Sequence, residues 1–90
     1  MKGRSKFYGE FRMVSPVQIE LALNINSYRK KYNMSQTEFS LVCNLCGEKD
    51  DVSFSAGEIC RYELMKTAPR KDKFQVLCNV LDMNLSLYIK

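Results

Sequence analysis

Apolar residues recur at helical spacing along most of the chain, and the first segment that they define is the longest. Its apolar stripe has members three or four residues apart, which places them on one helical face: Val17, Leu21, Ile25, Tyr28 and Tyr32. Ser15 precedes the stripe as a helix-capping residue, Pro16 suits the first helical position and Gln18 completes a capping box. We therefore expect a first helix over residues 16–32. Three cations crowd its last turn, where we favour pairing with the helix dipole over phosphate contact: Arg29, Lys30 and Lys31.

The same capping signal occurs twice more, each time before a short apolar pattern. Both boxes join a serine to a glutamate three residues later: Ser35 to Glu38, and Ser55 to Glu58. The helices that they open are expected over residues 36–44 and 56–63. In each, an apolar residue before the cap can pack on one after it as a hydrophobic staple: Met34 on Phe39, and Phe54 on Ile59. Two short, strongly specified helices therefore lie in tandem.

The chain after the third helix begins with a basic connection, residues 66–70. A fourth helix is expected over residues 70–81, and its buried stripe contains Phe74, Leu77, Cys78 and Leu81. Asn84 can cap a short fifth helix. No segment shows the alternation of a strand, and there is no repeat or low-complexity segment. The pattern therefore predicts an all-α fold of five helices.

The first fourteen residues differ from the rest because they show no sustained periodicity. Four cations stand there against Glu10 alone: Lys2, Arg4, Lys6 and Arg12. A mobile basic arm and a solvated tail without a role fit this composition equally well. Three aromatic residues indicate that part of the segment docks on the domain or on a partner: Phe7, Tyr8 and Phe11. We therefore divide the chain into a basic N-terminal arm, residues 1–14, and one compact domain, residues 15–90.

Length and composition limit the classes of protein to consider. Ninety residues with 46% hydrophobic content allow one modest core. The net charge of +4 is compatible with a polyanionic partner without requiring one. No apolar run is long enough to cross a bilayer, and no signal-peptide core follows the basic start. We therefore expect a cytoplasmic protein with no membrane partner.

Few residues are available for catalysis. The chain contains no histidine, which removes Ser-His and Cys-His catalysis and every zinc site that uses histidine. Its acids and lysines form no paired-carboxylate or phosphate-loop arrangement. We therefore expect neither an enzyme nor a cofactor.

The tandem capped helices carry a family resemblance. Residues 35–40, with the sequence Ser-Gln-Thr-Glu-Phe-Ser, followed by residues 55–63 and then Pro69, resemble the Cro and phage-repressor family of helix-turn-helix DNA-binding domains. In that family the second helix of the pair enters the major groove, while the first lies across the backbone. The resemblance covers residues 16–89 and implies a sequence-specific transcriptional regulator that binds a pseudo-palindromic operator in double-stranded DNA as a homodimer. Repression is the commoner outcome for such a domain, so a repressor is expected. Family members commonly form the dimer through their C-terminal helix.

The resemblance also implies a role for individual residues. Gln36 matches a position that contacts phosphate beside the recognition helix, and Ser55 matches a cap that also reaches phosphate. Four residues match positions that face base edges: Ala56, Gly57, Cys60 and Arg61. Three others match a buried anchor, a packing residue and a structurally paired acid, in this order: Ile59, Tyr62 and Glu63.

The chemistry of these side chains supports only part of that assignment. Arg61 alone can form a bidentate pair with guanine, while Ala56 offers apolar contact to a thymine methyl group and Gly57 only close approach. Glu58 could accept from cytosine, although capping uses the same carboxylate, and Lys66 adds a cation from the basic connection. Because so few of these side chains can read bases, we expect the arm, phosphate contacts or DNA shape to supply much of the specificity. It also leaves open a protein-interaction or antitoxin-like use of the scaffold.

The chain departs from the family between the two motif helices. A short turn is usual there, typically through a glycine, whereas this chain inserts residues 45–53. Three acids dominate the insertion: Glu48, Asp50 and Asp51. We expect this loop to lie peripherally, away from DNA, where it either meets a protein partner or stays solvated. The fold can accommodate the insertion, because each doubling of loop length costs only about 0.6 kcal/mol.

The four cysteines are expected to be thiols, because disulfides are rare in the cytoplasm. Cys43 and Cys46 have the Cys-x-x-Cys spacing of a zinc or redox motif, and Cys60 and Cys78 could complete four ligands. A second Cys-x-x-Cys pair is missing, which disfavours a four-cysteine zinc site. The resemblance matches Cys43 to a core aliphatic position and Cys78 to a core alanine, which implies that both are small buried hydrophobes, and Cys46, in the loop, is expected to be the most exposed thiol. Cys60 would lie at the DNA surface, where its oxidation could interfere with binding.

Overall fold

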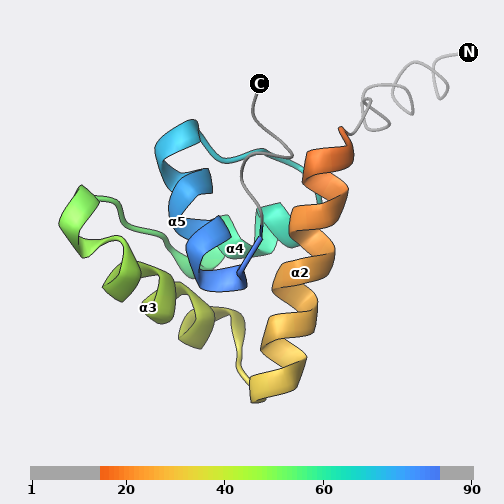
Figure 1. Ribbon diagram of the computed structural model, residues 1–90. Coiled ribbons are helices and arrows are strands. Elements are labelled where there is room, and N and C mark those ends of the chain that lie inside the picture. Colours follow the sequence, from red (N-terminus) through yellow and green to blue (C-terminus); the bar gives the residue numbers. More distant parts are fainter. Residues whose placement is uncertain (1–14, 84–90) are drawn as a thin grey trace, which may run out of the picture.

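The computed structural model describes residues 15–83, and all regular secondary structure in this range is helical (Figure 1). Its elements follow in the order α2 Pro16–Tyr32, α3 Gln36–Cys46, the 3-10 helix η1 Glu48–Asp50, α4 Ala56–Glu63 and α5 Lys71–Leu81. The all-α class is therefore confirmed, with four α-helices in the described range. The predicted basic arm and the predicted fifth helix lie outside the described residues.

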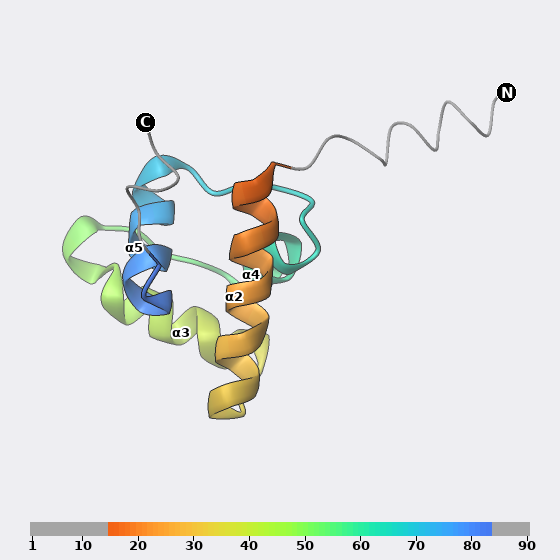
Figure 2. The ribbon, with the colours of Figure 1, turned by 45° about the vertical axis from the view of Figure 1, so that its right-hand side comes forward.

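The four α-helices surround a shared core. α2 forms one side of the molecule, and α3 starts where α2 ends and runs away from it (Figure 1). α4 packs against both α2 and α3, and α5 packs on α3 and α2 (Figure 2). Among these helices none is both long and apolar enough to cross a membrane.

All three predicted capping boxes form. At α3, the Ser35 Oγ accepts from the Glu38 N–H at 3.1 Å, and Glu38 Oε1 accepts from the Ser35 N–H at 2.8 Å. The same reciprocal bonds form at the other two boxes: Ser15 with Gln18, and Ser55 with Glu58. Because these bonds satisfy backbone donors that a helix start leaves unpaired, each helix begins where its box predicts.

The core contains most of the predicted apolar stripes. Its most deeply buried side chains are Leu21, Ile25, Phe39, Cys43, Ile59, Val76 and Leu77. Four predicted members differ. Val17, Tyr28 and Leu81 are only partly buried, and Tyr32 is 52% exposed and packs its ring on that of Tyr28, with centroids 4.8 Å apart. Val76, which the predicted stripe of the fourth helix omitted, is 1% exposed.

The segment between α3 and α4 is only partly peripheral, so that prediction was wrong for Val52 and Gly47, which are buried. α3 continues to Cys46, and Val52 then enters the core, where it is 6% exposed. Gly47, the first residue of this segment, lies so close to Val52 that a Cβ on it would stand 2.8 Å from the Val52 carbonyl oxygen. The Asn44 side chain holds the segment too, since it donates to the Phe54 carbonyl oxygen at 3.2 Å and accepts from the Phe54 N–H. The acids of the insertion are exposed: Glu48, Asp50 and Asp51.

Candidate nucleic-acid interface

α4 presents two sides of different character. Its inner side is buried, with Ile59 at 0% and Tyr62 at 3% exposure, as predicted for an anchor and a packing residue. The four residues predicted to face bases share the other side, which we call the outer strip: Ala56, Gly57, Cys60 and Arg61. Their helical spacing puts them together, and each is partly or fully exposed. The outer strip therefore combines small side chains with a single charge.

The side chain of Arg61 extends along the outer strip toward the start of α4. A Cβ built on Gly57, one turn earlier, would stand 3.6 Å from Arg61 Nη1. Gly57 has no positive φ and no close backbone neighbour, so the fold itself does not require a glycine at this position. Its missing side chain leaves the helix backbone and the guanidinium open to an incoming ligand.

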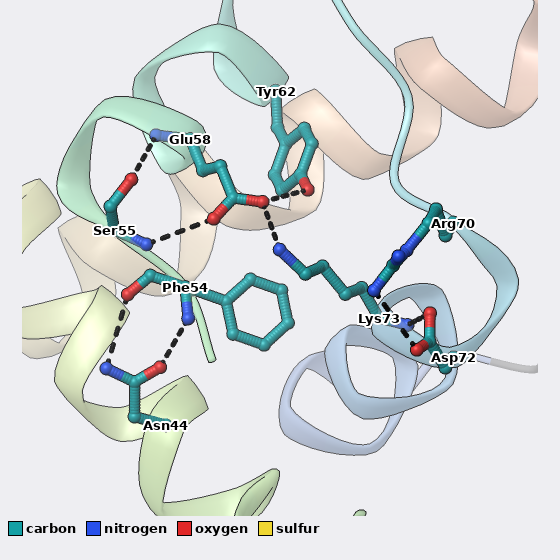
Figure 3. Close-up of polar contacts among 8 residues, drawn as sticks. All are labelled: Asn44, Phe54, Ser55, Glu58, Tyr62, Arg70, Asp72 and Lys73. Atoms are coloured by element: carbon teal, nitrogen blue, oxygen red, sulfur yellow. Dashed lines mark hydrogen bonds and ion pairs between the residues drawn. The ribbon is translucent and has the colours of Figure 1, made fainter. Parts of the chain in front are cut away.

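Glu58 has its carboxylate engaged within the protein (Figure 3). Oε1 accepts from the Ser55 N–H at 3.2 Å, while Oε2 accepts from Tyr62 Oη at 3.0 Å and pairs with Lys73 Nζ at 2.5 Å. Partial burial by itself raises the pKa of Glu58, but the hydrogen bonds from Lys73, Ser55 and Tyr62 and the positive charge of Lys73 outweigh it, so the pKa is lowered. These contacts commit the carboxylate to holding α4, which leaves the predicted cytosine contact without support.

The two side chains that contact Glu58, those of Tyr62 and Lys73, are held by their own surroundings. Burial raises the pKa of Tyr62, and the hydrogen bond to Glu58 and its negative charge raise it further, so the phenol remains a donor. Lys73 Nζ also lies 5.3 Å from the centroid of the Phe54 ring, within cation–π range. The side chains of Lys73 and Glu58 are only 18% and 21% exposed. The start of α4 is therefore tied to α5.

A second ion pair holds the end of α4. Arg29 of α2 places Nη1 2.8 Å from Glu63 Oε2 and 2.9 Å from Oε1, and the Gln36 amide of α3 donates to the same carboxylate. Glu63 thus has the structural partner that the resemblance implied. Arg29 was missed, because its position in the last turn of α2 explained its charge locally. Gln36 lies beside α4 as predicted, although part of its donor capacity serves Glu63.

Basic side chains gather between α4 and α5. An open pocket of about 340 Å³ lies there, lined by Glu58, Arg61, Tyr62, Thr67, Ala68, Pro69, Arg70 and Lys73. Arg70 is highly exposed and pairs with Asp72 at 3.4 Å, a contact that contributes little in water. Lys66, predicted to bind DNA, is exposed on the same connection. With three cationic side chains against one carboxylate, the pocket favours an anionic neighbour such as a phosphate.

The cysteines divide as predicted into buried and accessible thiols, and all four are free. Burial raises the pKa of Cys43 to about 12 and also raises that of Cys78, so both remain protonated. Cys46 is exposed at the end of α3, and Cys60 is partly exposed on the outer strip. Within residues 15–83, no group of three or more potential ligands is placed to hold a metal ion.

The structure brings the predicted DNA-binding residues into one region. Six lie at the start of α4 or along its exposed surface: Ser55, Ala56, Gly57, Glu58, Cys60 and Arg61. Gln36 borders the end of α4, and Lys66 follows it. No protein-family model matches the chain, and no curated protein or solved structure is significantly similar to it. The function is therefore argued from the site itself.

Proposed function

We propose that the chain is a sequence-specific DNA-binding transcriptional regulator in which α4 enters the major groove. The observation that carries this proposal is the contrast between the two sides of α4. One side is buried and both ends are tied by ion pairs, whereas the outer strip carries only small side chains and Arg61. The major groove is about 12 Å wide and accepts an α-helix. Small side chains allow close approach to the base edges, and Arg61 supplies the bidentate donor that guanine accepts.

The distribution of charge favours the same docking. Four exposed cations lie on α4 or between α4 and the start of α5: Arg61, Lys66, Arg70 and Lys71. The acidic helix η1 follows α3 at its far end, at the left edge of both views (Figures 1 and 2). A DNA backbone that passes α4 would therefore meet the cations while the acids of η1 stay remote.

In this proposal the described helices belong to a five-helix repressor-like helix-turn-helix domain. α3 and α4 form the motif, and residues 45–53 lengthen its loop. Two such domains would bind a pseudo-palindromic operator as a homodimer, with recognition helices about 34 Å apart. Repression is the simplest outcome, because occupation of an operator by itself blocks access to it.

The test selects binding sites for the whole chain from a random pool of duplex DNA and then measures affinity for the selected and for a scrambled sequence. Arg61→Ala should lower the ratio of the two affinities about tenfold, since one bidentate guanine contact contributes about 1–3 kcal/mol. Lys49→Ala is the control, because it removes an exposed cation from η1 and should leave the ratio unchanged. Enrichment of no sequence would contradict the proposed function, and an unchanged ratio for Arg61→Ala would contradict docking through α4.

A protein-interaction or antitoxin-like use of the scaffold is the second candidate. Leu41 and Leu45 favour it, because they stand one turn apart on the outer side of α3 and are 56% and 74% exposed. Under this alternative the DNA selection would enrich nothing. A double change of Leu41→Ser and Leu45→Ser would then remove the binding of a protein partner and leave the core intact.

A further inference from the structure

Lys73 lies on α5, outside the helix pair, yet its side chain ends at the start of α4 (Figure 3). Its Nζ is 2.5 Å from Glu58 Oε2 and 5.3 Å from the centroid of the Phe54 ring. Glu58 closes the capping box with Ser55, and Phe54 is the buried residue just before that cap. Lys73 therefore contacts two of the side chains that determine how α4 begins.

We propose that Lys73 is a positioning residue for DNA recognition, which acts through Glu58 and does not touch DNA itself. It sets the position of the first turn of α4, where Ala56 and Gly57 are expected to face the bases. The inference rests on the function proposed above. In this inference, α5 helps to control the position of α4, the helix proposed to read DNA.

The burial of the Lys73 side chain favours this positioning role over a direct phosphate contact. The side chain of Lys73 is 18% exposed, whereas that of Arg70, on the same edge of the pocket, is 75% exposed. The charge of Lys73 is matched by Glu58 at short range, and a pair shielded from solvent is screened less by salt than a surface pair. Tyr62 Oη donates to the same carboxylate oxygen, so Glu58 joins α5 to the inner side of α4. Loss of Lys73 would therefore free the first turn of α4 without removing a group from the DNA-facing surface.

The test is a double-mutant cycle on the whole chain with Lys73→Met and Glu58→Gln. Met keeps an unbranched apolar stem and removes the charge, whereas Gln keeps the capping bond and removes the ion pair. Each single variant should lower the ratio of selected to scrambled DNA affinity about tenfold, comparable to the loss of one charge-assisted hydrogen bond. The double variant should be no worse than either single variant. The dependence of affinity on salt should stay that of the wild type, because no phosphate contact is lost.

Lys71→Met is the matched control, since Lys71 is an exposed cation on the same helix. This change should affect selected and scrambled DNA equally and leave their ratio unchanged. Lys73→Arg keeps a cation opposite Glu58 and should restore most of the ratio. If Lys73→Met does not fold, Lys73→Arg and Glu58→Gln still decide the question, because an unchanged ratio for Glu58→Gln would overturn the inference.

Other results would overturn it as well. An effect of Lys73→Met that adds to that of Glu58→Gln and reduces the log–log salt slope by about 0.9 would identify a direct phosphate contact. Titration of the Glu58 carboxyl group by NMR needs no DNA: Lys73→Met should move its midpoint to higher pH, and no movement would show that the pair does not act on Glu58. Failure of the wild-type chain to select any DNA sequence would overturn the proposed function and this inference with it. An unchanged ratio on DNA that the wild type does select would overturn the inference alone.

Discussion

α3 and α4 begin with the same capping box in different surroundings. In both boxes the serine Oγ accepts from the glutamate N–H, and the glutamate Oε1 accepts from the serine N–H. Glu38 is exposed on α3, whereas Glu58 is partly buried and also meets Lys73 and Tyr62. The box thus starts both helices, and at α4 its glutamate also joins that start to a distant segment of the fold.

The outer sides of the two helices differ as well. α3 exposes Leu41 and Leu45, which are large and apolar, whereas the outer strip of α4 exposes small residues and Arg61, and the large apolar Leu64, 56% exposed, follows only at the C-cap. Under the proposed function, small side chains let α4 approach base edges in the major groove, while large apolar side chains suit a protein surface. The same local motif can thus serve two kinds of surface, depending on what lies opposite its buried stripe.

The largest expected effect tests the difference between the two boxes. Glu58→Ala should lower the free energy of unfolding by about 2 kcal/mol, against about 0.5–1 kcal/mol for Glu38→Ala, because it removes bonds to Lys73 and Tyr62 in addition to the cap. Urea denaturation of the two variants measures both costs. Equal costs would show that the partners of Glu58 contribute nothing to stability.

A smaller effect follows from the lowered pKa of Glu58. Because the folded protein binds this proton more weakly than the unfolded chain, the contacts stabilise the fold above the ordinary glutamate pKa of about 4.3, and this contribution is lost as the pH falls through the lowered value. Wild type should exceed Glu58→Gln in free energy of unfolding by about 1 kcal/mol near pH 7, and the gap should shrink below about pH 4. Denaturation over this range provides the measurement. A gap that stays constant into strong acid would be inconsistent with a lowered pKa.

The smallest expected effect concerns how the two helices end. After α4, Met65 adopts a left-handed conformation with φ 59°, and the Lys66 N–H donates to the Arg61 carbonyl oxygen at 2.9 Å, a helix end at which glycine is usual. Met65→Gly should raise the free energy of unfolding by about 0.5–1 kcal/mol, measured by thermal or urea denaturation. Gly47, after α3, offers the opposite case, because it has φ −93° and is needed only for its close approach to Val52. A loss of stability in Met65→Gly would show that the methionine side chain makes contacts that outweigh its backbone strain.

Local signals in the sequence determined most of the secondary structure of residues 15–83. The capping boxes located the starts of α2, α3 and α4, because their hydrogen bonds join residues only three positions apart. The family resemblance implied that Ile59 is a buried anchor and Tyr62 a packing residue, and because both are buried, helical spacing puts the outer strip of α4 opposite them. The candidate site was predictable to this extent because a helix places its side chains by sequence spacing alone.

The partners that hold α4 were decided by the tertiary structure. Arg29 and Glu63 are 34 residues apart, and Glu58 and Lys73 are 15 residues apart. Two of these charges had a sufficient local explanation, the capping box for Glu58 and the helix end for Arg29. The resemblance implied that Glu63 is paired but did not identify Arg29 as its partner, and nothing along the chain singled out Lys73. No pattern along the chain distinguishes a charge that stays on the surface from one that meets a partner from another helix.

The insertion between α3 and α4 shows the same limit for an apolar residue. From the sequence, residues 45–53 were predicted as a peripheral loop, and the exposure of its acids was correct. The sequence did not indicate that Val52 enters the core or that the Asn44 amide binds the Phe54 backbone. A single apolar residue has no periodicity to mark a buried face. Its burial depends on a space that exists only after the surrounding helices have packed together.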